Sequence, residues 1–390
     1  MDASLPQLLL DHLRRHQDEM VDFLRGLVLA ESPTLVPESQ EEVFARLAEG
    51  LAAAGYRTRR LRGRTSGGQL WAAPRERRRR SGRMQLLLGH SDTVWPLGTL
   101  ASMPVELRDG RLTGPGSFDM KGGLTQGVFA LRALAELGLE PPVPPAFFIN
   151  SDEEMESPDS VRQIRRLAHH AERVFVLEPA FGPEGRLKTG RKGTGHFQVT
   201  VHGRAAHAGL DPQKGASAIL GLSHAIQQLH ALSDFERGTT VNVGVISGGS
   251  RRNVVAPEAR GVVDVRVLRQ EDAAAVERAI RSLDPVVPGT KIEVAGGMVK
   301  PPLEPTPRNR ALWQAAQRCA GELGFELGEA TVGGASDGNT TSQYTPTLDG
   351  MGAVGDGAHA AHEYVEVARM PERAALLAMM LMQPATSAGG

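Results

Sequence analysis

Residues 146–156 read AFFINSDEEME and join a short apolar run to a cluster of acids. A continuous apolar run of this length is typical of a strand that is buried on both faces of a sheet. The acids follow at once, with Glu153 and Glu154 adjacent and Glu156 close behind. Such carboxylates repel one another unless water solvates them or a cation lies between them. The stretch therefore predicts a buried strand that ends in either a solvated turn or a functional site.

Two further segments repeat this pattern. MQLLLGH (84–90) is a nearly continuous apolar run that ends at His90, and VFVLEP (174–179) carries Glu178 near its end. The helices expected from apolar residues at three- to four-residue spacing are 4–28, 40–54, 120–138 and 159–172. The alternation of strands and helices predicts an α/β fold, with a mostly parallel twisted sheet and helices on both faces. In such sheets, ligands bind at the carboxyl ends of the strands.

The pattern changes after residue 190, where apolar and polar residues alternate as they do in half-buried antiparallel strands. The expected strands are 196–203, 239–247, 259–268 and 291–296, and the expected helices are 214–232 and 271–283. We predict an α+β sandwich over residues 190–301, inserted into a discontinuous main domain formed by 1–189 and 302–390. The proline-rich segment KPPLEPTP (300–307) is expected to link the inserted domain back to the main domain.

Bulk composition excludes several classes of protein. A chain of 390 residues exceeds the usual size of a single core, and its net charge of -1 creates no field that attracts nucleic acid or a membrane. The basic segment PRERRRRSGR (74–83) is either a polyanion-binding patch or a solvated loop, and we favour the loop. The single cysteine, Cys319, excludes an internal disulfide and is expected in the core. The N-terminus resembles neither a signal peptide nor a membrane span, so a cytoplasmic location is expected.

Candidate metal ligands follow several of the expected strands and helix starts. They are His90, Asp119 in GPGSFDMKGG, the pair Glu153 and Glu154, Glu178, and either His359 or His362 in DGAHAAHEY (356–364). Each one alone is ordinary, since an acid before a helix is commonly an N-cap. Together they offer imidazole and carboxylate groups without cysteine, a set that suits zinc, cobalt or manganese.

Six motifs give the sequence a specific likeness. HSDTVWP, GPGSFDMKGG, NSDEEME, LEP, GRAAHAG and HAAHEY occur in this order along the chain. They resemble the di-zinc metallopeptidase family that includes aminoacylases, succinyl-diaminopimelate desuccinylases and glutamate carboxypeptidases, and are most similar to the last of these. The resemblance implies two divalent metal ions, zinc in the first instance with cobalt or manganese as alternatives, in a catalytic main domain. It also implies that the inserted block is a lid or dimerisation domain.

The resemblance implies a role for each motif residue around the metals. The five implied ligands are Asp119, which bridges the two metals, His90 and Glu178 on one metal, and Glu154 and His359 on the other. Asp92 would orient His90, and Glu153 would be the general base. His359 is preferred to His362 because it stands four residues before Glu363 in the family's H-x-x-x-E-Y pattern. The resemblance also implies that the peptide between Asp119 and Met120 is cis.

Further residues would bind the substrate, again by resemblance. His207 would stabilise the oxyanion of the tetrahedral intermediate in the neighbouring subunit, which implies a homodimer. Asn253 and Arg266 would hold the free α-carboxylate of a small-molecule or short-peptide substrate. The remaining candidates are Lys300 and Arg186 for a side-chain carboxylate, and Gly334, Ser336 and Asp337 in the loop GGASDGNTT (333–341) that would shape the pocket.

Three functional hypotheses follow from these residues. The first is a glutamate carboxypeptidase that releases glutamate from N-acyl or folate-like glutamates. The second is an aminoacylase or dipeptidase of the same family with another side-chain preference. The third is a catalytically silent peptide-binding relative, which the presence of Glu153 and all five ligands argues against.

Overall fold

The computed structural model describes residues 4–75 and 83–385. Within the basic segment at 74–83, residues 76–82 lie outside the described residues, so the choice between patch and loop stays a prediction. Contacts divide the chain into two compact units. The first unit comprises Met1–Thr189, Pro305–Thr331 and Ser336–Gly390, and the second comprises Gly190–Glu304 and Val332–Ala335.

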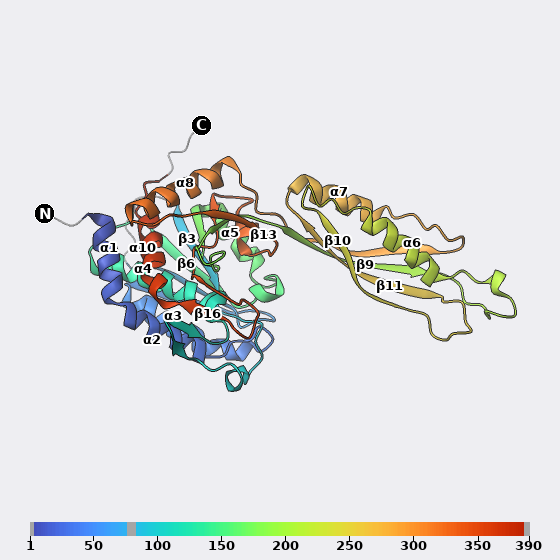
Figure 1. The fold of residues 1–390 in the computed structure, drawn as a ribbon, viewed down its shortest axis with the longest axis horizontal. Coiled ribbons are helices and arrows are strands. Elements are labelled where there is room, and N and C mark those ends of the chain that lie inside the picture. Colours follow the sequence, from blue (N-terminus) through green and yellow to red (C-terminus); the bar gives the residue numbers. More distant parts are fainter. Residues whose placement is uncertain (1–3, 76–82, 386–390) are drawn as a thin grey trace. The chain divides into compact units, whose positions relative to one another are not determined.

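A six-stranded sheet forms the centre of the first unit (Figure 1). Its strands, in spatial order, are β1 (Tyr56–Leu61), β2 (Gln69–Pro74), β6 (Pro145–Asn150), β3 (Met84–His90), β7 (Ala171–Val176) and β14 (Thr347–Leu348). The last four run parallel to one another, whereas β1 and β2 pair antiparallel at one edge. The prediction of a mostly parallel sheet is therefore confirmed, and the antiparallel edge is an addition to it.

Helices cover both faces of this sheet. On one face lie α1 (Leu5–Arg15), α2 (Gln17–Leu29), α3 (Gln40–Ala53), α4 (Gly122–Glu136), α8 (Pro307–Glu322) and α10 (Met370–Leu381). On the other face lies α5 (Val161–His170), against which the short helix α9 (Asp337–Thr341) packs. Successive strand residues point to opposite faces, so Leu87 packs under the first group while Leu86 and Leu88 pack under α5. Cys319 on α8 is buried in the larger core, as predicted.

The single helix predicted over residues 4–28 is wrong in one respect, because the structure has two helices that meet at His16. His16 leaves the helical conformation with φ −102° and ψ 14°. Its ring Nδ1 donates a hydrogen bond of 2.8 Å to the carbonyl oxygen of His12. A local side-chain bond of this kind satisfies a helix-terminal carbonyl without altering the apolar spacing, so periodicity alone gave no sign of the break.

The second unit holds an antiparallel sheet in the order β10, β11, β9, β12. The bounds of its elements are β9 (Gly193–His202), α6 (Ala218–His230), β10 (Thr240–Gly248), β11 (Glu258–Val267), α7 (Gln270–Arg281) and β12 (Lys291–Lys300). Side chains from α6 and α7 pack on one face of the sheet and form its core. Helix α6 starts later than predicted because Pro212–Lys214 forms a separate turn and Ser217 caps the helix.

Short strands complete the described fold. Near the sheet of the first unit, β4 (Leu107–Arg108), β5 (Arg111–Thr113), β15 (Gly355–Asp356) and β16 (Tyr364–Glu366) form one small sheet, and β8 (Leu187–Arg191) pairs with β13 (Glu329–Val332). Across the described residues, no helix combines the length and the apolar character needed to cross a membrane.

Candidate metal centre

Three neighbouring parallel strands bring their carboxyl ends to the same edge of the central sheet. His90 is the last residue of β3, and Glu178 lies two residues beyond β7. Glu153 and Glu154 open the short turn η4 (Glu153–Met155) that follows β6. Because β3 lies between β6 and β7, these side chains meet at one place. This is the edge at which open α/β sheets bind their ligands.

Two loops complete the group. Asp119 lies in η3 (Ser117–Lys121), a five-residue turn that precedes α4, and the Asp119–Met120 peptide bond is cis, as the resemblance implied. His359 lies in the turn between β15 and β16 with a positive φ of 60°, a conformation that few residues other than glycine adopt.

The predicted ligands form two groups that share Asp119. In the first group, Nε2 of His90 is 3.4 Å from Oδ1 of Asp119 and 3.5 Å from Oε1 of Glu178. In the second, Nε2 of His359 is 3.6 Å from Oδ2 of Asp119 and 3.2 Å from Oε2 of Glu154. Within each group, the ligand atoms lie within 4.8 Å of one another. The two oxygens of Asp119 thus face different groups, as a bridging carboxylate requires.

These separations fit a metal ion in each group. Tetrahedral coordination with bonds of about 2.0–2.2 Å places neighbouring ligand atoms about 3.3–3.6 Å apart. Oδ1 of Asp119 is buried and, in the described part of the chain, has no hydrogen-bond partner of good geometry, its contact with Nε2 of His90 being long at 3.4 Å. A buried carboxylate oxygen that lacks such a partner is unfavourable unless a cation binds it. The donor set of imidazole and carboxylate suits zinc, cobalt or manganese.

The electrostatics of the two groups also favour a bound cation. Burial opposes a charge on His90, but hydrogen bonding to Asp119 and other carboxylates outweighs it and raises the pKa of His90 well above 6.5. A hydrogen bond to Glu154 raises the pKa of His359 to about 9. Burial raises the pKa of the Glu154 carboxyl in turn. The ligands therefore hold a surplus of negative charge that a proton or a metal ion must offset.

Asp92 links the histidine to both glutamates. Nδ1 of His90 donates to the carbonyl oxygen of Asp92 at 3.0 Å and lies 3.4 Å from its Oδ1, which leaves Nε2 to face the ligand group. The Asp92 carboxylate also accepts the backbone N–H of Glu153 at 3.3 Å, that of Glu154 at 3.2 Å, and the Thr34 hydroxyl at 2.8 Å. Asp92 therefore positions residues of both metal groups and the backbone of the expected base, a wider role than the one predicted.

Glu153 and Glu154 take different positions although they are adjacent. The Glu154 carboxylate belongs to the second ligand group, whereas Glu153 belongs to neither. Glu153 is half-buried, and its backbone is fixed by Asp92. His362 belongs to none of the ligand groups formed by the described residues, so the structure brings His359 and not His362 to the centre.

Glu363 is a functional residue whose role the sequence analysis missed. One of its carboxylate oxygens accepts hydrogen bonds from the backbone N–H groups of Phe118 and Asp119. The other accepts hydrogen bonds from the backbone N–H of Gly116 and the indole N–H of Trp95. All four bonds are 2.9 Å long. These bonds fix the turn that carries the bridging carboxylate. Burial raises the pKa of Glu363 to about 7. Only its place in HAAHEY was noticed, and a motif position says nothing about which backbone groups a side chain reaches.

We expect Glu363→Gln to weaken metal binding by about 10–100-fold, the usual cost of losing a group that orients metal ligands. Glutamine keeps one acceptor oxygen but turns an NH₂ group toward backbone donors, which destabilises the turn around Asp119. Titration of the metal-free protein with zinc against a chelator measures this change. Glu366→Gln is the control, because Glu366 lies three residues further on, at the end of β16, with its side chain 33% exposed. This variant should bind zinc as the wild type does. Equal affinities for both variants would refute the role of Glu363.

His207 and Asn253 lie side by side in the second unit. The backbone of His207 bridges to Val254, and the N–H of Ala208 donates to the carbonyl oxygen of Asn253 at 2.9 Å. Nδ1 of the exposed His207 ring accepts the N–H groups of Gly209 and Leu210 at 3.1 Å. A neutral His207 must then carry its proton on Nε2, so it presents a hydrogen-bond donor outward.

The other predicted substrate contacts are already engaged within the protein to different degrees. Arg266 makes two bonds of 3.0 Å to Asp264, so a substrate carboxylate would have to replace that partner. Arg186 lies over the Phe181 ring and 3.6 Å from Glu184, and Lys300 is only 4% exposed. The three candidates in the loop 333–341 are also hydrogen bonded within the protein.

In that loop, Ser336 is fully buried, caps α9 and donates to Asp349 at 2.5 Å. Asp337 accepts bonds from Asn150 and Ser157, and the carbonyl oxygen of Gly334 accepts one from Arg191. These bonds fix the shape of the loop. The Ser336 hydroxyl and the Asp337 carboxylate therefore hold the loop in place.

Comparison with known proteins places this centre in a family. Residues 86–383 match the model of "Peptidase family M20/M25/M40". The chain belongs to this family. The resemblance read from the six motifs is thereby confirmed, and family membership makes the protein a metal-dependent hydrolase.

Individual relatives differ in the activity that their names state. Carboxypeptidase G2 of Pseudomonas sp. (strain RS-16) is 28% identical over 308 residues, which cover 78% of this chain and 74% of that protein. Succinyl-diaminopimelate desuccinylase of Dechloromonas aromatica (strain RCB) is 27% identical over 338 residues, 82% of this chain and 87% of its own. A solved dinuclear metal-binding M20 peptidase from Bacillus subtilis shares the fold, with a TM-score of 0.69 and 13% identity over 95% of this chain and 98% of that one.

Proposed function

We propose that this M20 hydrolase cleaves the amide bond to a C-terminal amino acid and releases glutamate from N-acyl or folate-like glutamates. The observation that carries the hydrolytic part of the proposal is the sharing of Asp119 between two ligand groups, with Glu153 on the same turn as Glu154. Similarity to carboxypeptidase G2 supports the carboxypeptidase reaction. We propose zinc in both groups, with cobalt or manganese as alternatives, because the donor set suits these ions.

The chain's own residues would carry the proton and charge movements of this reaction. Two divalent cations held by His90, Asp119, Glu154, Glu178 and His359 would polarise the scissile carbonyl and lower the pKa of a bound water. Glu153 takes the proton of the attacking water and delivers it to the leaving amine. Nε2–H of His207 donates to the oxyanion that forms. Asn253 and Arg266 hold the free carboxylate, with Arg266 exchanging Asp264 for the substrate.

Substrate preference can be tested directly on the metal-reconstituted protein. We expect the highest kcat/KM for an N-acyl-glutamate among N-acyl-glutamate, N-acyl-methionine, N-succinyl-diaminopimelate and a set of dipeptides. The alternative is an aminoacylase, desuccinylase or dipeptidase, and similarity to the desuccinylase, 27% identical over 338 residues, supports it. A preference for any other member of the panel would support that alternative. Metal binding without turnover of any member would indicate a silent peptide-binding relative.

We propose that the second unit acts as a lid and joins two copies of the chain into a homodimer. Strand β10 is the edge strand of its sheet, and it exposes Val245 by 62% and Ile246 by 64%. Ile219 and Leu220, at the start of α6, are each 50% exposed. An exposed apolar edge strand is a template for pairing with another chain. Sedimentation equilibrium should show a dimer, and Val245→Lys with Ile246→Lys should shift it to monomer.

We expect His207→Ala to lower kcat by about 10²–10³-fold, the usual effect of removing one oxyanion donor. If His207 of the partner subunit serves each site, mixing this variant with Glu153→Gln should restore activity, because the hybrid dimer contains one site with both groups. Random mixing restores at most about a quarter of wild-type activity. Two inactive variants that stay inactive after mixing would show that His207 acts within its own chain.

A further inference from the structure

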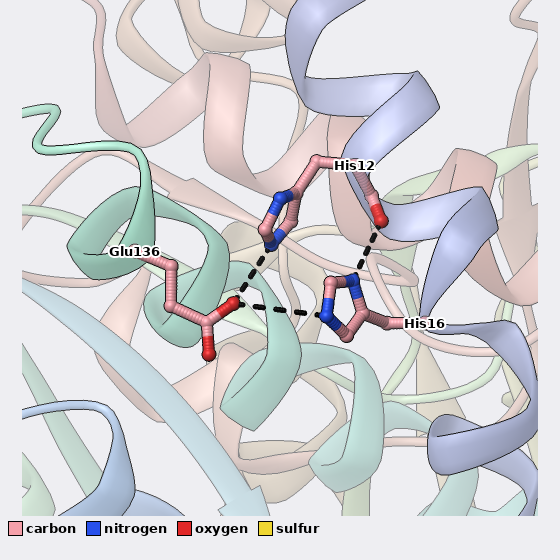
Figure 2. A group of neighbouring side chains, drawn as sticks. All are labelled: His12, His16 and Glu136. Carbon is pink, nitrogen blue, oxygen red and sulfur yellow. Dashed lines mark hydrogen bonds and ion pairs between the residues drawn. The ribbon is translucent and has the colours of Figure 1, made fainter.

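A third cluster of metal-type ligands lies away from the proposed catalytic centre, where α1 meets α4 (Figure 2). It consists of His12 and His16, four residues apart at the end of α1, and Glu136, the last residue of α4. One ligand atom from each residue lies within 4.8 Å of the others. Neither the sequence motifs nor the proposed reaction uses any of these residues.

The geometry of the cluster converges on one carboxylate oxygen. Nε2 of His12 is 2.9 Å from Oε2 of Glu136, and Nε2 of His16 is 3.9 Å from the same atom. The contact between His12 and Glu136 is a hydrogen bond in this structure. Small side-chain shifts would bring both distances to the separation of about 3.3–3.6 Å between neighbouring ligands of a tetrahedral ion. Figure 2 shows both rings turned toward Glu136, His12 from α1 and His16 from the break between α1 and α2. His12 lies in the last turn of α1 and His16 caps that helix one turn later, so the two imidazoles reach Glu136 from neighbouring turns of the chain.

The hydrogen bonding of the His16 ring also favours a cation at this place. Its Nδ1 donates to the carbonyl oxygen of His12, so in the neutral ring the lone pair of Nε2 points toward Oε2 of Glu136 and toward Oε1 of Glu19 at 3.7 Å. A lone pair facing carboxylate oxygens is repulsive unless a proton or a metal ion lies between them. His90 in the catalytic centre has the same arrangement, with Nδ1 bound to a backbone carbonyl and Nε2 facing carboxylates. A backbone carbonyl is a common partner for the outer nitrogen of a metal-bound histidine.

Arg132 holds the two carboxylates from the opposite side. Its Nε donates to Oε1 of Glu136 and its Nη1 to Oε2 of Glu19, both at 2.6 Å. The other oxygen of each glutamate is the one nearest the histidines. The cluster also lies at the carboxyl ends of α1 and α4, where the helix dipoles favour a cation, whereas the amino end of α2 at His16 opposes one.

We propose that His12, His16 and Glu136 bind a divalent transition-metal ion such as Zn²⁺, with Glu19 or water as the fourth ligand. This site is structural and separate from the two catalytic metals. It fastens the first helix to α4, against which α1 packs. Bound ion therefore stabilises the folded chain, because a ligand that binds only the folded state raises its stability.

Metal counting tests the proposal without any reference to activity. Equilibrium dialysis of the full chain against zinc, followed by metal analysis, should give three ions per wild-type chain and two for His16→Gln and for Glu136→Gln. His16 and Glu136 have side chains 23% and 36% exposed, so these variants should fold. Loss of one ligand should weaken the third site by about 100-fold or more, beyond the 10–100-fold typical of losing an outer partner. Two ions in the wild type, or three in both variants, would overturn the proposal.

A matched control and a second readout separate this site from general effects. His169→Gln with His170→Gln changes two histidines at the end of α5 that belong to no ligand group formed by the described residues, and this variant should still bind three ions. After the catalytic centre is loaded, further zinc should raise the melting temperature of the wild type and of this control. The same addition should leave the melting temperatures of His16→Gln and Glu136→Gln unchanged. A rise of equal size in all four proteins would contradict a site at His12, His16 and Glu136.

Discussion

Replacing Glu153 by glutamine should leave both catalytic metals bound and lower kcat by about 10²–10⁴-fold, the range typical of general-base catalysis. The amide has nearly the shape of the carboxylate but cannot accept a proton at neutral pH. Its backbone contact with Asp92 does not involve the side chain, so the turn should be retained. Glu153 belongs to neither ligand group, and its replacement should therefore not release metal. Steady-state kinetics and metal analysis on the same sample measure both quantities.

Two neighbouring substitutions serve as controls for this result. Glu154→Gln alters a residue of the second ligand group and should reduce the bound metal as well as the rate. Glu156→Gln makes the same chemical change three residues away and should preserve both. The three variants together distinguish a proton-transfer role from metal binding and from damage to the turn. Turnover near the wild-type value in Glu153→Gln would exclude this residue as the base.

The sequence was sufficient for the parts of the centre that regular strands position. His90 and Glu178 follow buried apolar runs, and the parallel arrangement of such runs brings their ends to one edge. Residue type and hydrophobic period alone predict this meeting of strand ends. Asp119 and His359 lie in irregular turns, and only the resemblance indicated that they would reach the same place.

Contacts between side chains and backbone could not be predicted in this way. Glu363 binds three backbone N–H groups far away in the sequence, and no periodic pattern reports such bonds. The break at His16 depends on one hydrogen bond to His12 within an otherwise continuous apolar pattern. Arg266 was predicted to bind the substrate carboxylate. In the structure, its guanidinium is hydrogen bonded to the carboxylate of Asp264, two residues earlier on the same strand. In each case, the partner was decided by tertiary geometry.

Replacing Asp119 by alanine should release both catalytic metals and abolish measurable turnover. Each of its oxygens faces a different ligand group, so one substitution removes a ligand from both. The remaining pairs, His90 with Glu178 and His359 with Glu154, would each have too few protein ligands to hold an ion tightly. Loss of the metals removes several kcal/mol of transition-state stabilisation, which corresponds to about 10³-fold or more in rate. Metal analysis after dialysis and assays at saturating zinc test both parts.

Glu178→Ala is the matched comparison, because Glu178 contributes to the first ligand group alone. It should release one metal and leave the His359 and Glu154 group loaded, whereas Asp119→Ala should release two. The difference between the two variants therefore reports bridging itself and not the general cost of removing a carboxylate. If Asp119→Ala retained an ion in either catalytic group, in addition to the one at His12, His16 and Glu136, the two catalytic groups would be independent sites. The shared carboxylate would then have no bearing on how the second metal is held.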